Sequence, residues 1–219
     1  MTALLEVRHL AASIQAMPAL RDLSLAVGEG EMVCLVGRNG AGKTSFMRAV
    51  MGHLPAAGGE LRFAGQDLKP LPRHARAALG IGYMPEDRGL VPQLTVEENI
   101  LLPVWVSKTL DKTERLALAY RLLPEVQAMR ERRALLLSGG QQKLVALARA
   151  LVAGTRLLML DEPFEGVAPA LAQRLAEVIH ALQGSTLAVL ISQSDAHHGA
   201  GLFVRRYTIE RGANAAGQA

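Results

Sequence analysis

The segment at residues 32–45, MVCLVGRNGAGKTS, constrains the fold more than any other part of the chain. Its apolar start predicts a buried strand, and its glycine-rich centre gives way to a helical stretch at Lys43. The spacing fits G-x-x-x-x-G-K-[ST], in which backbone N–H groups and a helix N-terminus surround phosphate oxygens. In this pattern Lys43 reaches the β- and γ-phosphates of a nucleotide, and the Thr44 hydroxyl reaches Mg²⁺. The residues expected to bind the phosphates are Gly37, Arg38, Asn39, Gly40, Ala41, Gly42, Lys43, Thr44 and Ser45.

The length and composition favour α/β layers, in one compact unit or in one domain with an inserted subdomain. Half of the 219 residues are hydrophobic and only 4% are aromatic, which is typical of packed Leu, Val and Ala side chains. The net charge of +4 is spread along the chain without a basic block, so no nucleic-acid partner is expected. Cys34 is the only cysteine, which favours a reducing, cytoplasmic setting. The longest apolar stretch, residues 144–160, is interrupted by charged and small residues and cannot span a bilayer unaided.

The order of elements predicts a parallel sheet with helices between its strands. Strands are expected at residues 4–10, 20–27, 32–36, 60–63, 81–84, 157–160 and 186–192. Helices are expected at residues 44–51, 113–123, 139–152 and 169–182, with a further helix opening at the capping box of residues 95–98. Residues 52–59 are expected to form a loop, and so is the segment that holds His197 and His198. In such folds the ligand lies at the carboxyl ends of the strands.

Two further segments carry chemistry. Asp161 and Glu162 close a buried strand, where Asp161 suits a phosphate-bound Mg²⁺, directly or through a water, and Glu162 can polarise a water for in-line attack on the γ-phosphate. Ser138 is expected to cap a helix whose first residues, Gly139 and Gly140, expose backbone N–H groups as a second anion site. Since one nucleotide has one γ-phosphate, two chains packed head to tail would each complete the other's site.

The segments GRNGAGKT, LSGGQ and LLMLDEP, in that order, resemble the nucleotide-binding subunit of ATP-binding cassette (ABC) transporters. The resemblance implies an α/β P-loop NTPase with a RecA-like mixed-sheet core, an antiparallel β subdomain and an inserted α-helical subdomain. It implies a single domain over residues 1–219, with the core at 1–85 and 154–212, the helical subdomain at 86–153 and a disordered tail at 213–219. It also implies ATP and Mg²⁺ as cofactors.

The same resemblance assigns roles to residues. Glu162 and Gln193 take catalytic positions, and Thr44, Glu86 and Asp161 take metal positions. Gln193 stands where the family has its switch histidine, Glu86 where it has the glutamine of the Q-loop, and Ile14 where it has an aromatic residue that stacks on adenine. Residues 166–169 match a loop that touches the opposite subunit. The segment that binds the sister subunit's nucleotide comprises Ser138, Gly139, Gly140 and Gln141.

Among ABC subunits, the segments PEDR, LTVEEN and DEPFEGVAP, together with a glutamine at the switch position, look like those of uptake systems for branched-chain amino acids, urea or related amides. That likeness implies transmembrane permeases and a second ATP-binding subunit, identical or related, as direct partners. It also implies a periplasmic solute-binding protein as an indirect partner, and a peripheral location at the cytoplasmic face of the inner membrane. Permease contact is expected from residues 87–105, where Leu90 and Trp105 lie either near that surface or in the core of the helical subdomain. Two alternatives stay open: a soluble ABC-type ATPase acting on nucleic acid or ribosomes, and a weakly hydrolysing cassette paired with a more active one.

Overall fold

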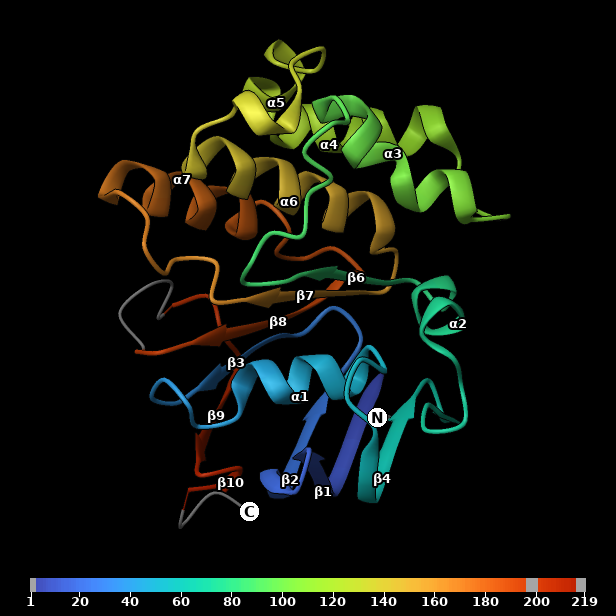
Figure 1. Cartoon of the computed structure of the whole chain (residues 1–219), viewed down its shortest axis with the longest axis vertical. Coiled ribbons are helices and arrows are strands. Elements are labelled where there is room, and N and C mark those ends of the chain that lie inside the picture. The colour runs from blue at the N-terminus through green and yellow to red at the C-terminus, as the bar shows by residue number, and fades with distance from the viewer. Residues whose placement is uncertain (1–2, 196–200, 216–219) are drawn as a thin grey trace.

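A computed structural model describes residues 3–195 and 201–215. In these ranges ten strands join in one sheet, and most helices gather above one of its faces (Figure 1). The strand order is β5-β4-β1-β2-β10-β9-β3-β8-β7-β6. The parallel part, which carries the candidate site, contains β3 (Met32–Val36), β6 (Ile81–Met84), β7 (Leu157–Asp161), β8 (Ala188–Gln193) and β9 (Arg205–Glu210).

The central parallel strands, β3, β7 and β8, are buried on both faces because their apolar residues alternate between two cores. Leu158 and Leu160 of β7 pack into one core, which α6 (Gly139–Ala153) and α7 (Pro169–His180) cover. Leu157 and Met159 point the opposite way, into a core that includes Phe46 of α1 (Lys43–Val50). Side chains that alternate along a strand explain this division. The result is a rigid sheet whose strand ends can hold a site.

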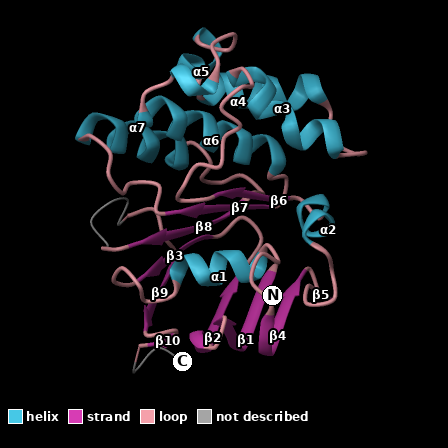
Figure 2. Ribbon diagram, viewed as in Figure 1, coloured by secondary structure: helices cyan, strands magenta, loops and turns pink. Residues whose placement is uncertain are grey.

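An antiparallel group of strands lies beside α1, at the bottom of Figure 2. It consists of β1 (Leu5–Ile14), β2 (Met17–Val27), β4 (Ala56–Phe63) and β5 (Gln66–Asp67). The loop predicted for residues 52–59 is wrong in its second half, because β4 begins at Ala56 and pairs with β1. Glycine at position 59 allows β4 to approach β1 closely, because a Cβ there would lie 2.2 Å from the carbonyl oxygen of His9.

Most of the helical elements lie between β6 and β7 in the sequence and form the upper layer of Figure 2. They are α3 (Val96–Val106), α4 (Lys112–Leu122), α5 (Pro124–Ala128), the 3₁₀ turn η1 (Ala134–Leu136) and α6. The predicted capping box is confirmed, since Thr95 and Glu98 exchange hydrogen bonds at the start of α3. A short helix, α2 (Arg73–Ala78), was not predicted. No described helix is long and apolar enough to cross a membrane.

The prediction of a disordered tail at residues 213–219 is wrong for its first residues. Ala213–Asn214 forms β10, which pairs with β9 and with β2. The Asn214 amide explains the order, because its Oδ1 accepts a hydrogen bond from the Ser24 N–H at 2.7 Å and its Nδ2 donates to the Ser24 carbonyl at 2.9 Å. Residues 216–219 lie outside the described part of the chain, and so do His197 and His198.

Candidate nucleotide-binding site

The phosphate loop, residues 37–42, connects β3 to α1 at the carboxyl end of β3. Gly40 and Gly42 have φ angles of +79° and +114°, which favour glycine and let the loop curl before α1 begins at Lys43. Gly37 has no room for a side chain, since a Cβ there would lie 2.4 Å from the carbonyl oxygen of Ile209. The predicted strand, loop and helix are therefore confirmed. The loop's backbone leaves Arg38, Asn39 and Gly40 exposed.

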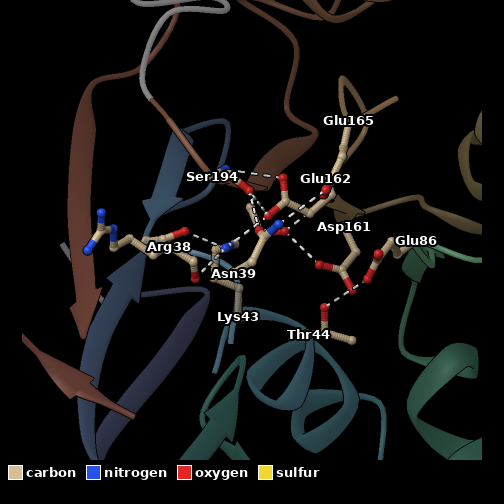
Figure 3. A network of polar contacts seen from close by, with 11 residues as sticks. Arg38, Asn39, Lys43, Thr44, Glu86, Asp161, Glu162, Glu165 and Ser194 are labelled. Atoms are coloured by element: carbon tan, nitrogen blue, oxygen red, sulfur yellow. Dashed lines mark hydrogen bonds and ion pairs between the residues drawn. The ribbon is translucent and has the colours of Figure 1, made fainter. Parts of the chain in front are cut away.

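The Lys43 ammonium lies at the centre of the polar network in Figure 3. The residue is 4% exposed, and its Nζ lies 2.9 Å from Oε1 of Glu162. Nζ also donates hydrogen bonds to the carbonyl oxygen of Gly37 and, at 3.1 Å, to that of Arg38. The loop lysine thus contacts the carboxylate predicted to polarise water. Incoming phosphate oxygens would compete with that carboxylate for the same ammonium.

Asp161 is fully buried at the end of β7 and is held by neighbouring strands. Its Oδ1 accepts a hydrogen bond from Ser192 Oγ at 2.6 Å, and its Oδ2 accepts one from the Tyr83 hydroxyl at 3.3 Å. Burial raises the pKa of Asp161, against hydrogen bonds from Ser192, Thr44 and Tyr83 that lower it. Beside it, Thr44 Oγ1 lies 3.5 Å from Oε2 of Glu86. The three expected metal residues present hydroxyl and carboxylate oxygens, which are the donors that Mg²⁺ prefers.

Glu162 follows Asp161 in a backbone conformation that is uncommon for its residue type. Its φ angle is +49°, and its N–H donates to Ser192 Oγ at 3.0 Å. Its carboxylate accepts hydrogen bonds from the Ser194 N–H at 3.1 Å and from Ser194 Oγ at 2.9 Å. Gln193, between these two serines, is 3% exposed and lines a small cavity together with Glu162. Glu162, one of the two residues predicted to be catalytic, is thus held by serines at the end of β8.

Ser192 and Ser194, on either side of Gln193, contact the acidic residues of the site and were not predicted from the sequence. Ser192 bonds to both acidic residues of β7 and its extension, while Ser194 reaches the Glu162 carboxylate and Asn39 Oδ1. Their spacing of two residues at the end of a buried strand is a usable signal, because alternate strand residues share a face.

A cavity of about 720 Å³ extends from the phosphate loop toward β1 and β2. Lys43, Thr44, Glu86 and Glu162 line its polar part. The far wall includes Ile14, which is 50% exposed, and Met17, which is 76% exposed. No aromatic side chain is among the described lining residues, so an adenine ring here would meet aliphatic groups.

The segment at residues 138–141 lies apart from this cavity. Ser138 caps α6 as predicted: its Oγ accepts from the Gln141 N–H at 3.3 Å, and Gln141 Oε1 accepts from the Ser138 N–H at 3.0 Å. Ser138 and Gly139 are exposed, and of the described residues at 138–141 none lines the nucleotide cavity. Residues 166–169, which lead into the first residue of α7, are also largely exposed. One chain therefore presents one phosphate loop and one separate helix start.

A parallel sheet core with a phosphate loop after β3, acidic residues at the end of β7 and a helical insert between β6 and β7 defines a P-loop NTPase of the cassette type. The chain belongs to the ABC transporter family, whose model matches residues 20–165, and it is an ATP-binding, ATP-hydrolysing subunit of that family. Cassettes of this family dimerise and work with transmembrane permeases.

Relatives named for different transport systems are similar to this chain. It is 35% identical over 194 residues to the high-affinity branched-chain amino acid transport ATP-binding protein BraG of Pseudomonas aeruginosa, covering 89% of this chain and 83% of BraG. It is 34% identical over 212 residues to the lipopolysaccharide export system ATP-binding protein LptB of Escherichia coli K12, covering 96% of this chain and 88% of LptB. A solved ATP-binding subunit of an ABC transporter matches with a TM-score of 0.85 at 26% identity, covering 97% of this chain and 88% of that one.

Proposed function

We propose that this chain is the ATP-hydrolysing subunit of an ABC importer for branched-chain amino acids or related amides such as urea. The observation that carries the hydrolytic part is the buried contact between Lys43 and Glu162 beside Asp161. The similarity to BraG and the glutamine at position 193 support the importer part.

In this proposal the β- and γ-phosphates draw Lys43 away from Glu162. The freed carboxylate, still bonded to Ser194, then polarises the attacking water. Gln193 donates a hydrogen bond to the γ-phosphate without adding a positive charge. The α6 N-terminus of a sister chain, with Ser138, Gly139, Gly140 and Gln141, completes the site from outside.

Thr44, Glu86 and Asp161 are the residues that would hold Mg²⁺, which when bound neutralises charge that develops on the phosphates. The short distance between Thr44 and Glu86 and the buried carboxylate of Asp161 support this donor set. Glu86 in place of a neutral amide adds one negative charge to the set. This charge favours the metal and disfavours the phosphates.

A groove of about 790 Å³ between α1, β6 and α3 supports a permease contact. Asp87, Pro103 and Val106 line it, within or next to the predicted contact segment, residues 87–105. Trp105, predicted to lie near this surface, is 55% exposed, and Val106 is 86% exposed. Leu90, the other predicted residue, packs half-buried against the core beneath α3. We therefore place the permease on the exposed end of α3.

We also propose the division of the single domain at residues 1–219 into a core (1–85 and 154–212) and a helical subdomain (86–153). The helices between β6 and β7 support it. Together with the proposed permease contact, it supports a peripheral location at the cytoplasmic face of the inner membrane.

The test is reconstitution with the membrane subunits encoded beside the gene, in lipid vesicles, with a solute-binding protein and leucine, isoleucine, valine or urea. We expect one of these solutes, with its binding protein, to accelerate ATP turnover. The same membrane subunits without any binding protein serve as the control. A rate of ATP turnover that none of the four solutes changes would contradict the importer assignment and leave the ATPase assignment intact.

A second candidate is an export function, which the similarity to LptB over 96% of the chain favours. In the same vesicles, acceleration of ATP turnover by lipopolysaccharide in the absence of any binding protein would support the exporter and exclude the importer.

A further inference from the structure

Lys143, on the second turn of α6, is a buried cation outside the phosphate loop. It is 5% exposed, and its partners are two backbone carbonyl oxygens rather than a carboxylate. Its Nζ donates to the carbonyl of Glu162 at 3.1 Å and to that of Glu165 at 2.6 Å. Burial lowers the pKa of Lys143, as does the charge of Arg88, against the carboxylates of Glu165, Glu162 and Glu86. A buried ammonium is costly, so its position calls for a reason.

The two carbonyls belong to one tight turn. The Glu165 N–H donates to the Glu162 carbonyl at 3.2 Å, which closes the turn, and Glu162 adopts its φ angle of +49° there. The two glutamates of this turn reach the phosphate loop and the lysine that follows it. Glu162 contacts Lys43, and Glu165 Oε1 accepts a hydrogen bond from Asn39 Nδ2 at 3.3 Å. A residue that fixes the turn therefore fixes how Glu162 faces the phosphates.

Lys143 reaches this turn from the helix that Ser138 caps. Helix α6 is a rigid rod of 15 residues, packed with nine buried side chains. A displacement of its N-terminus therefore moves the Lys143 ammonium, and the ammonium moves with the Glu162 carbonyl. In the proposed dimer, the same helix start would contact the sister chain's nucleotide.

We propose that Lys143 is a positioning residue, which holds the Glu162–Glu165 turn from α6 and ties the orientation of Glu162 to the helix end that meets the sister chain's nucleotide. The inference deepens the proposed function and rests on the role of Glu162 in it. Lys143 itself touches neither nucleotide nor water in this account.

The test compares Lys143→Met, which keeps the length of the side chain and removes the donors, with Lys143→Arg, which keeps donors. Steady-state ATP turnover of the full chain gives kcat and KM, and a fluorescent ATP analogue gives the Kd for nucleotide. For Lys143→Met we expect kcat to fall by about 10- to 100-fold, as for a misplaced catalytic group, with KM and Kd within about twofold of wild type. Lys143→Arg restores most of kcat. The exposed Lys112→Met is the matched control and leaves kcat unchanged.

A double-mutant cycle separates positioning from general damage to the fold. Combined with Glu162→Gln, Lys143→Met should slow the residual turnover no further, because both changes act through one carboxylate. Multiplicative losses, or a wild-type kcat in Lys143→Met, would overturn the inference. If Lys143→Met does not fold, judged by its thermal melt, Lys143→Gln takes its place in the cycle with the same expectation.

The controls also separate this inference from the proposed function. If Glu162→Gln turns over ATP at the wild-type rate, the proposed hydrolytic role of Glu162 fails, and the inference fails with it. If Glu162→Gln is inactive while Lys143→Met is fully active, the inference alone fails.

Discussion

The phosphate-loop region and the N-terminal end of α6 are both expected to bind phosphate, yet they differ in how complete they are. Around the loop, Lys43, Asp161 and Glu162 are buried, and the two acidic residues bond to residues of β6, β8 and α1. At α6, Ser138 and Gly139 are exposed, and hydrogen bonds of Ser138 join it to the first turn of its own helix. A buried polar network is rigid and organised within the chain, whereas an exposed helix start is free to receive a ligand from another molecule. The difference supports the proposal that each chain supplies part of two sites, which a second chain completes.

The largest expected effect comes from Glu162→Gln. Loss of the carboxylate that polarises water should lower the rate of ATP turnover by about 10²- to 10⁴-fold, while nucleotide binding continues. We expect an ATP-dependent dimer to accumulate, which size-exclusion chromatography with light scattering would detect. Unchanged hydrolysis would remove Glu162 from the mechanism.

Blocking the exposed N-terminal end of α6 should lower the rate of ATP turnover less than Glu162→Gln does. Ser138→Arg places a bulky cation at the α6 N-terminus, and we expect turnover to fall by about 100-fold, comparable to the loss of one stabilising donor group. Binding of ATP to the single chain should persist, since Ser138 does not line the nucleotide cavity. An arginine at exposed Thr109 is the control. A Ser138→Arg protein with full turnover would show that the α6 end takes no part.

A smaller effect is expected on the Kd for ATP from the end of the cavity where the adenine base would lie. Replacing the half-exposed Ile14 by tyrosine supplies a ring on which adenine can stack, and the Kd for ATP should fall by about 2- to 10-fold. Isothermal titration calorimetry would measure the change. An equal Kd for both proteins would mean that the base does not lie against Ile14.

The smallest effect lies outside both regions, in the ion pair between Glu125 of α5 and Arg174 of α7 at 2.8 Å. Burial raises the pKa of Glu125, but hydrogen bonds and charge from Arg174 outweigh it, so the pKa is lowered overall. A lowered carboxyl pKa stabilises the fold above the unfolded value of about 4.3, and this contribution is lost as the pH falls through the folded value. Glu125→Gln should therefore lose under about 1 kcal/mol of unfolding free energy at pH 7 and less near pH 3, with turnover unchanged. Urea unfolding at the two pH values would measure this difference, and an equal loss at both would contradict it.

Local patterns were sufficient to predict the parts of the site that depend on local chemistry. The spacing of Gly37, Gly42 and Lys43 predicts the phosphate loop, and Ser138 with Gln141 predicts the start of α6. The contacts that orient Glu162 are different, because Ser194 and Lys143 lie 32 and 19 residues from it in sequence. The spacing of Ser192 and Ser194 marks a shared strand face, but no local pattern specifies which distant residue each side chain contacts.

The missed elements of the fold have a similar cause. Strand β10 has only two residues, Ala213–Asn214, and exists because β2 and β9 supply its partners and Ser24 bonds to the Asn214 amide. The glycines of β4 read as a loop in isolation, but their small size is what lets β4 approach β1. Tertiary pairing outweighed local propensity in both cases.

The most direct test of the central claim mixes two inactive chains, Lys43→Ala and Ser138→Arg. In a head-to-tail dimer the intact loop of the Ser138→Arg chain meets the intact α6 end of the Lys43→Ala chain, so one complete site forms. We predict that the mixture recovers up to about a quarter of the wild-type rate of ATP turnover, because half of randomly paired dimers hold one complete site of two. A mixture no more active than its separate components would contradict the claim that each chain completes the other's site.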